Sequence, residues 1–239
     1  MNYRSNLEAP DLRPYFKHLH GRVTPQSMGH FALSDFADKP ADDPVFAVHK
    51  NCQFWTLDEA AILYNCARQF PNGIAADIGS HTGWTSSYLM EAIQGIVYAV
   101  DPMYTNDVFA KRATLNVGER NIAMQPTTAD DFFSTMGLPL DVAVIDGNHD
   151  SPFPLKDAKG AAAHLDRRGL IMLHDFWGWP IQDAVTYLQK NGFKVMVYAT
   201  PNGVACCWRG DFKPPIHIPD PSIDWKSVWQ SRVTKFEIA

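Results

Sequence analysis

Four aspartates stand at or beside the ends of short apolar runs, and they are the side chains of this sequence best placed to do chemistry: Asp77, Asp101, Asp146 and Asp175. If these runs are neighbouring strands of one sheet, the four carboxylates gather at one edge of it. Carboxylates crowded in this way repel one another unless a cation lies between them. Asp146 and Asp175 are therefore predicted to share a divalent cation, with Mg²⁺ as the first candidate because it prefers oxygen ligands.

Two histidines accompany these aspartates. His149 follows Asp146 by three residues, and His174 directly precedes Asp175. A histidine with an ordinary pKa of about 6.5 can take a proton from a hydroxyl near neutral pH. His149 is therefore a candidate general base, and the alternative is a loop histidine that hydrogen-bonds an aspartate. His174 is either a third metal ligand, which would admit Mn²⁺, Fe²⁺ or Zn²⁺, or a strand-end histidine facing the helix layer; a metal-free site with either histidine as base is a further alternative.

The apolar runs that carry these side chains alternate with helical patterns between residues 55 and 209. Strands are expected over 74–78, 96–100, 121–125, 142–145, 170–173, 193–198 and 204–208. This alternation predicts a doubly wound, Rossmann-like α/β fold with a seven-stranded, mostly parallel sheet. The tight turn over 201–203, Pro-Asn-Gly, predicts that the last strand is antiparallel. Ligands of such sheets bind beyond the carboxyl ends of the strands, which is where the aspartates lie.

Capping signals mark where two of the helices begin and end. Thr56 and Glu59 form a capping box, so a helix is expected from Leu57 onward. Pro180 suits the first turn of a later helix, and Asn191-Gly192 supplies its C-cap. Hydrophobic periodicity predicts helices over 57–67, 84–93, 108–117, 155–165 and 181–188.

The turn after the first strand covers residues 77–83 and has glycines at Gly79 and Gly83. His81 stands where the dinucleotide fingerprint has its middle glycine, and without that glycine the backbone cannot approach a pyrophosphate closely. No Gly-Lys-Ser/Thr follows, so the turn is not a P-loop either. It suits a ligand that contains adenosine but no phosphates.

Two acids could hold such a ligand. Asp101 ends the second strand, where a carboxylate can accept hydrogen bonds from both ribose hydroxyls; the alternative is a solvated strand end. Asp77 could accept from an ammonium group or from backbone amides of the turn.

Several of these features together resemble the class I S-adenosylmethionine-dependent methyltransferases. They are the turn over 77–83, Asp101, Asp130 after the third strand and Asp146 after the fourth. With Trp84 behind it, the turn is similar to that of catechol-type O-methyltransferases of small molecules. Residues 145–149 and 169–175 are similar to the bacterial branch that acts on sugars and secondary metabolites. The resemblance covers roughly residues 55–209.

The resemblance implies S-adenosylmethionine as cofactor and a hydroxyl of a small molecule, a sugar or secondary metabolite, as methyl acceptor. Residues implied to hold the cofactor are Asp77, Gly79, Ser80, Gly83, Asp101, Asp130 and Asp146. Among them Asp77 supports the amino-acid end, Asp101 holds the ribose and Asp130 lies near the adenine amino group. Asp130 has an alternative role, because residues 128–131 could simply cap the helix that starts at Phe132.

The resemblance also assigns a reaction centre. It implies that Asp146 and His149 are catalytic, with His149 as base, and that Asp146, Asp175 and His174 hold the metal, most simply Mg²⁺. The sequence departs from the family pattern at two positions. Phe176 stands where the catechol type has an asparagine, and His174 stands where sugar-modifying relatives have an acid. These departures concern the third metal ligand.

Two other functions compete with this interpretation. Residues 147–150, Gly-Asn-His-Asp, match a signature of calcineurin-like metallophosphoesterases. The other motifs of that family do not occur in the required order. The family needs a His-x-His pair late in the chain, whereas His18-Leu19-His20 lies in the N-terminal arm, before residues 147–150. The second alternative is a non-catalytic protein that binds S-adenosylmethionine, against which His149 and Asp175 argue.

Composition limits the classes of partner. With 26 acidic and 21 basic side chains among 239 residues, the net charge of −5 argues against a general nucleic-acid binder. No apolar run reaches the ~18–20 residues of a membrane span, and residues 1–13 contain no apolar signal core. The 4 cysteines include no CxxC pair, which fits a reduced, cytoplasmic protein.

Nine of the 17 prolines lie outside the predicted domain, in residues 1–54 and 212–221. We therefore expect an N-terminal arm or lid over 1–54, the methyltransferase domain over 55–210 and a C-terminal extension over 211–239. Proline-rich segments make poor helices and stiff loops. The arms are accordingly expected to form a lid or a contact within a homo-oligomer, with these side chains as candidates: His18, His20, His30, Trp225 and Trp229.

Overall fold

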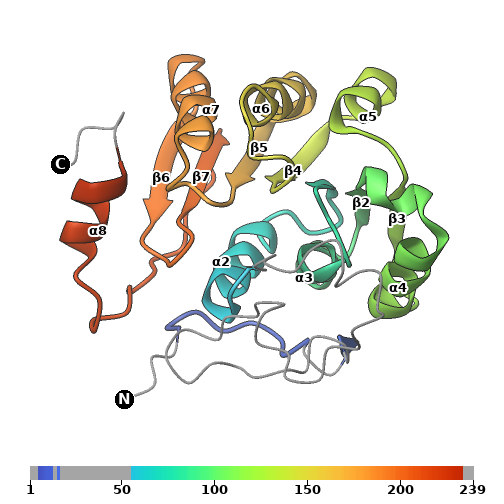
Figure 1. The fold of residues 1–239 in the computed structure, drawn as a ribbon, viewed down its shortest axis with the longest axis horizontal. Coiled ribbons are helices and arrows are strands. Elements are labelled where there is room, and N and C mark those ends of the chain that lie inside the picture. The colour runs from blue at the N-terminus through green and yellow to red at the C-terminus, as the bar shows by residue number, and fades with distance from the viewer. Residues whose placement is uncertain (1–4, 13–14, 17–54, 234–239) are drawn as a thin grey trace.

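The computed structural model describes residues 5–12, 15–16 and 55–233 (Figure 1). Most of the N-terminal arm, with His18, His20 and His30, lies outside the described residues. The described residues form one seven-stranded sheet with helices on both of its faces. Among them, no helix is both long enough and apolar enough to cross a membrane.

The sheet has the strand order β3-β2-β1-β4-β5-β7-β6. Its strands are β1 (Ile74–Ile78), β2 (Ile96–Val100), β3 (Ile122–Gln125), β4 (Leu140–Ile145), β5 (Leu165–Leu173), β6 (Lys194–Tyr198) and β7 (Val204–Arg209). Strands β1 to β5 pair in parallel, whereas β7 is antiparallel to both β5 and β6. The predicted doubly wound α/β fold with an antiparallel last strand is therefore confirmed.

Strand β5 differs most from its predicted bounds, whereas the other strands differ by two residues or fewer. Strand β5 begins at Leu165, not after a turn at Gly169, because Leu165 already pairs with Leu140 of β4. A register shift follows before Leu170 pairs with Val142, and this irregularity broke the apolar pattern that the prediction relied on.

Helices cover the two faces of the sheet in two groups of three (Figure 1). One group is α2 (Leu57–Ala67), α3 (Trp84–Ile93) and α4 (Asp107–Val117); the other is α5 (Ala129–Thr135), α6 (Phe153–His164) and α7 (Trp179–Lys190). A short 3₁₀ helix, η4 (Pro102–Thr105), follows β2, and α8 (Trp225–Arg232) follows the sheet. The predicted capping box of α2 is present, since Thr56 and Glu59 exchange side-chain-to-backbone hydrogen bonds of 2.8 and 3.1 Å.

The central strands are buried on both faces, which explains their continuous apolar runs. On β4, Val142 and Val144 pack into the cluster of α2 and α3, whereas Ala143 and Ile145 pack into the cluster of α5, α6 and α7. Alternate residues of one strand thus serve two cores. The strand ends that follow these runs are held in place by packing on both sides.

The turns after β1 and β4 lie against each other at the carboxyl edge of the sheet. Gly79 has φ +82°, and a Cβ atom at this position would lie 2.3 Å from the backbone oxygen of Asp146. No other residue can occupy position 79 without moving these two turns apart. The first glycine of the predicted cofactor turn therefore has a structural role, because it brings the ends of β1 and β4 together.

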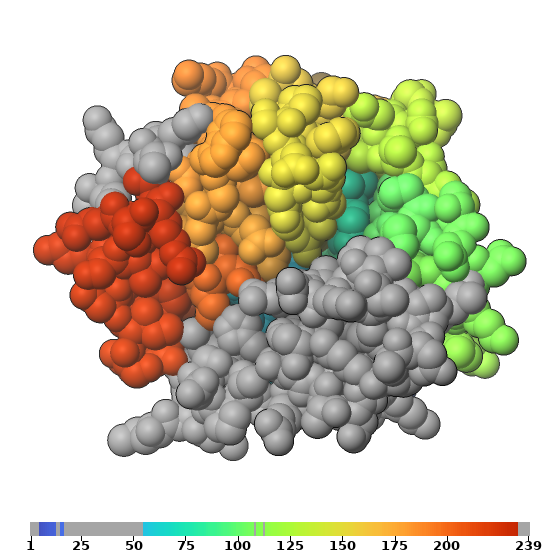
Figure 2. Space-filling view, viewed as in Figure 1, coloured from blue at the N-terminus to red at the C-terminus, as the bar shows by residue number. Residues whose placement is uncertain are grey.

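The C-terminal extension docks against the end of the sheet. Trp229 of α8 contacts Phe176 and Trp177, with ring centroids 6.1 and 5.3 Å apart, and Gln182 of α7 donates a hydrogen bond of 2.9 Å to the carbonyl of Arg232. In Figure 2 this segment (red) lies beside the surface that residues around α7 form (orange). Helix α8 is therefore part of the wall next to the loops after β5 and β6.

Candidate functional site

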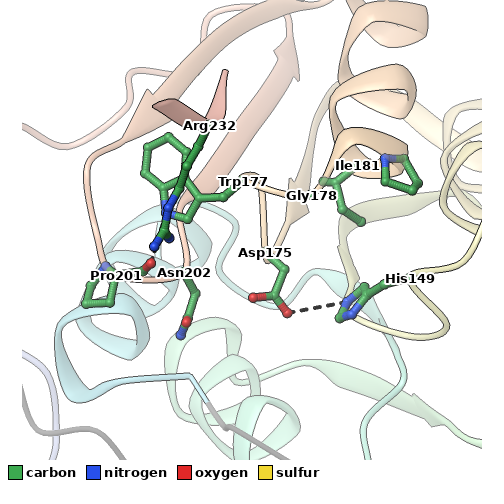
Figure 3. Close-up of a pocket in the computed structure, with 9 residues that line it drawn as sticks. His149, Asp175, Trp177, Gly178, Ile181, Pro201, Asn202 and Arg232 are labelled. Atoms are coloured by element: carbon green, nitrogen blue, oxygen red, sulfur yellow. Dashed lines mark hydrogen bonds and ion pairs between the residues drawn. The ribbon is translucent and has the colours of Figure 1, made fainter. Parts of the chain in front are cut away.

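Three predicted site residues meet at the carboxyl ends of β4 and β5. Nε2 of His149 lies 3.3 Å from Oδ1 of Asp146. It also lies 3.5 Å from Oδ2 of Asp175 (Figure 3). One ligand atom from each of these side chains lies within 4.8 Å of the others. Asp175 has φ +53°, a left-handed conformation that aspartate tolerates better than most residues. The cluster has the donor types and the spacing to hold one divalent cation.

His174 lies behind this cluster instead of facing the solvent. It is almost fully buried, with Nε2 3.2 Å from Oε2 of Glu59 and Nδ1 3.2 Å from Oδ1 of Asp146. Trp55 stacks on its ring at a centroid distance of 4.6 Å and donates from Nε1 to Oδ2 of Asp146 at 2.9 Å. Both ring nitrogens of His174 therefore face carboxylates, and it is His149 that completes the three-residue cluster with Asp146 and Asp175.

Glu59 is fully buried and joins α2 to the turn between β6 and β7. Its carboxylate accepts a hydrogen bond from Oγ1 of Thr200 at 2.7 Å. It also accepts from the backbone N–H and from the side-chain Nδ2 of Asn202, each at 3.1 Å. Burial by itself raises the pKa of Glu59, but attraction to His174 and the hydrogen bonds outweigh burial and hold the pKa at about 2. Glu59 is thus a buried anion whose charge is compensated by His174.

The charges of the two histidines follow from their neighbours. Burial lowers the pKa of His174, but the carboxylates of Asp146, Asp175 and Glu59 raise it well above its usual range. His174 is therefore an imidazolium that bridges two carboxylates at neutral pH. For His149, burial also lowers the pKa, and the hydrogen bond and charge of Asp146, together with Asp175, raise it overall.

His149 and Asp175 are the accessible side chains of this group. They are 42% and 41% exposed, compared with 17% for Asp146 and 1% for His174. The hydrogen bond to Asp146 fits the loop-histidine interpretation, and it is also the contact by which a carboxylate orients a base. A ligand entering from the solvent therefore reaches His149 and Asp175 first.

The turn after β1 contains a buried carboxylate oxygen without a partner. Oδ2 of Asp77 accepts hydrogen bonds from Thr85 at 2.6 Å and from Ser86, whereas Oδ1 is buried and has no hydrogen-bond partner among the described residues. Burial raises the pKa of Asp77 to about 7 against the opposing effect of these hydroxyls. A nearby ammonium group would satisfy Oδ1 and favour the charged form.

Asp101 and Ser80 join the turn to the loop after β2. The carboxylate of Asp101 accepts hydrogen bonds from the backbone N–H groups of His81 and Met103, both at 2.8 Å. The hydroxyl of Ser80 lies 2.6 Å from that of Tyr104, so this serine side chain is engaged with η4. Gly83 adopts φ +86° and begins α3 as its N-cap. These contacts determine the shape of the predicted cofactor turn.

Asp130 lies in the first turn of α5. The helix begins at Ala129 and not at Phe132, and Thr128 is its cap, since its side chain accepts from the N–H of Asp131 at 3.2 Å. The carboxylate of Asp130 is 61% exposed and lies 3.5 Å from Nζ of Lys156. Its predicted place near an adenine amino group stays a prediction.

A pocket of about 270 Å³ opens beside the cluster (Figure 3). Its lining comes from the loops after β4, β5 and β6, from the start of α7 and from the end of α8: His149, Asp175, Trp177, Gly178, Pro180, Ile181, Pro201, Asn202 and Arg232. The pocket is therefore placed to hold a small molecule next to the side chains that could remove a proton from it.

Among the residues of this region that the sequence does not predict as part of a site are Trp55, Glu59 and Arg232. Glu59 carries only a capping-box signal in the sequence, because its contacts with His174, Thr200 and Asn202 come from segments far away in the chain. Trp55 and Arg232 carry no local signal, because their contacts come from segments far away in the sequence.

This chain is similar to known proteins in one domain and in its fold. A family model described as a methyltransferase domain matches residues 76–176. A search of curated protein sequences finds no significant match. Among solved structures, a methyltransferase from Geobacter sulfurreducens is 18% identical, with a TM-score of 0.55 over 71% of this chain and 90% of that one.

Two further structures share the fold at similar levels. An O-methyltransferase from Bacillus cereus in complex with SAH is 12% identical, with a TM-score of 0.54 over 70% of this chain and 87% of that one. A precorrin-6y C5,15-methyltransferase from Geobacter metallireducens is 15% identical, with a TM-score of 0.54 over 65% of this chain and 91% of that one. At these identities the likeness concerns the fold, and the fold by itself does not select a methyl acceptor.

Proposed function

We propose that this protein is an S-adenosylmethionine-dependent methyltransferase that methylates a hydroxyl oxygen of a small molecule. The match of residues 76–176 to a methyltransferase domain supports this proposal. His149 is the general base of this proposal, and Asp146 and Asp175 hold a divalent cation. The observation that carries it is the cluster of Asp146, His149 and Asp175 beside a pocket of about 270 Å³ at the carboxyl edge of the sheet. This is where ligands of doubly wound sheets bind.

The residues of the turn after β1 fit the cofactor. The unpartnered Oδ1 of Asp77 suits the amino group, and the rigidly held carboxylate of Asp101 suits the ribose hydroxyls. Gly79, Ser80 and Gly83 shape the turn between these two acids, and Asp146 borders it. Asp130, beyond β3, is assigned to the adenine end.

Proton transfer follows from the geometry of His149. The acceptor hydroxyl gives its proton to Nε2, whose new positive charge is stabilised by Asp146 and Asp175. The oxygen lone pair forms the new bond to the methyl carbon as the carbon–sulfur bond of the sulfonium breaks, and its electron pair stays on sulfur. Proton removal by a positioned histidine contributes a rate factor of about 10²–10⁴. Binding of the acceptor in the pocket would in addition align its oxygen with the methyl group.

The residues present also fit a divalent metal. Asp146 and Asp175 would offer one carboxylate oxygen each, and water or the acceptor would complete the shell, while His149 beside them stays free as the base. When bound, the cation would lower the pKa of the acceptor hydroxyl. His174 is not a metal ligand in this proposal, because its two ring nitrogens already contact Glu59 and Asp146.

Cofactor binding tests the proposal most directly. We expect S-adenosylhomocysteine to bind the full chain, and Asp101→Ala to weaken its affinity by about 10–100-fold, since hydrogen bonds to a charged group contribute about 1.5–3 kcal/mol. Isothermal titration calorimetry measures both. Asp107→Ala, which removes an exposed carboxylate of neighbouring α4, is the matched control and should bind normally. Equal affinities of the wild type and Asp101→Ala would contradict the cofactor assignment.

Metal removal tests the second part of the proposal. We expect a chelator to slow methyl transfer at least about 100-fold, because a cation at the reacting oxygen contributes several kcal/mol, and Mg²⁺ or Mn²⁺ to restore it. Calorimetry with Mn²⁺ should show binding that Asp175→Asn abolishes. Asp150→Asn makes the same change in charge at an exposed neighbour and should retain binding. Full activity in chelator would rule out the metal and leave the cofactor assignment intact.

A further inference from the structure

We propose that the acceptor carries an oxyanion, a carboxylate or a phosphate, and that Arg232 of the C-terminal helix binds it while the hydroxyl lies at His149 and Asp175. This inference rests on the proposed function and adds the substrate class. It also assigns a role to the C-terminal extension, which supplies the charge that selects the acceptor.

Arg232 is held at the pocket by its backbone, which leaves its side chain available. It is the last residue of α8, and its carbonyl accepts the hydrogen bond from Nε2 of Gln182 at 2.9 Å. The helix is further anchored by Trp229 on Phe176 and Trp177. The side chain itself is exposed, lines the pocket and forms no ion pair with any residue of the described ranges.

The charges around the pocket leave this guanidinium uncompensated. Among the residues that line the pocket, only His149, Asp175 and Arg232 carry ionisable side chains. Nε2 of His149 and Oδ2 of Asp175 lie 3.5 Å apart, so these two side chains contact each other. The walls between them and Arg232 are largely apolar, with Trp177 and Ile181 among them, and an apolar wall strengthens an electrostatic attraction. A guanidinium in such a place binds carboxylate or phosphate through two parallel hydrogen bonds.

The arrangement of the pocket sets the size of the acceptor. Figure 3 shows the guanidinium of Arg232 on the side of Pro201 and Asn202, with Asp175 and His149 across the pocket from it. Asn202 is itself held rigidly by two hydrogen bonds to Glu59. A volume of about 270 Å³ is at the lower end of small-molecule pockets. It fits one ring-sized group with an anion at one end and a hydroxyl at the other.

Pairs of acceptors that differ in one charged group test the inference. Calorimetry on the full chain, saturated with S-adenosylhomocysteine and Mg²⁺, compares catechol with 3,4-dihydroxybenzoate and glucose with glucose 6-phosphate. We expect at least one charged member to bind about tenfold or more tightly than its neutral partner. Arg232→Gln should abolish that preference, and Arg232→Lys should retain part of it. The pair that shows the preference distinguishes carboxylate from phosphate.

Controls separate this inference from the function on which it rests. Arg167→Gln makes the same charge change at an exposed arginine of β5 outside this pocket and should keep the preference. S-adenosylhomocysteine should bind Arg232→Gln as it binds the wild type. No preference in either pair, or a preference that survives Arg232→Gln, would overturn the inference while cofactor binding still stands. Loss of S-adenosylhomocysteine binding in the wild type would instead overturn the proposed function, and the inference with it.

Discussion

Replacing His149 by alanine is expected to lower the rate of methyl transfer by about 10²–10⁴-fold, the usual contribution of a positioned base. The reason is its position: Nε2 lies between Asp146 and Asp175, beside the pocket, and 42% of its side chain is exposed. The measurement is kcat with any acceptor that the wild type methylates, together with the affinity for S-adenosylhomocysteine, which should not change.

A second readout distinguishes the two roles open to His149. If His149 acts only as the base, His149→Ala should have a modest effect on Mn²⁺ affinity, because Asp146 and Asp175 remain. As a metal ligand its removal should weaken Mn²⁺ binding and activity together. His164→Ala is the control, since His164 lies at the end of α6 and hydrogen-bonds Gly160 away from the cluster. An unchanged kcat in His149→Ala would refute both roles.

Replacing Glu59 by alanine is expected to cost about 3–5 kcal/mol of unfolding free energy, as removal of one partner from a buried ion pair does. The variant leaves His174 buried between Asp146 and an empty space, and it removes the acceptor of Thr200 and Asn202. At about 2–4 °C per kcal/mol, the midpoint of thermal unfolding should fall by about 6–20 °C. Denaturant and thermal unfolding at neutral pH measure these changes.

The controls isolate the buried charge from the helix cap. Thr56→Ala removes the other half of the capping box and should cost only about 1 kcal/mol. Because the folded pKa of Glu59 is depressed from 4.5 to about 2, its stabilising effect is complete above pH 4.5 and is lost as the pH falls toward 2. The difference between wild type and Glu59→Ala should shrink over that range. A loss no larger than that of Thr56→Ala would show that the ion pair adds no stability.

Patterns along the chain predict the strands and the edge of the sheet, but they do not predict its irregularities. The apolar runs that end at Asp77, Asp101, Asp146 and Asp175 predicted both the strands and the edge at which these acids lie, because a parallel sheet places the carboxyl ends of its strands together. Strand β5 was predicted too short because a register shift interrupts its apolar pattern. Periodicity describes regular segments and misses such irregularities.

What the sequence by itself determined is the doubly wound fold, the turn over 77–83 and the candidate residues His149 and Asp175, since each depends on residue types at short spacing. The tertiary structure decided how they combine. It placed His149 at the front of the cluster and His174 behind it, in contact with Glu59, a residue 115 positions earlier in the chain. It also brought Arg232 to the pocket through the packing of α8. Contacts of this range depend on how whole elements pack, and no local pattern of residues encodes them.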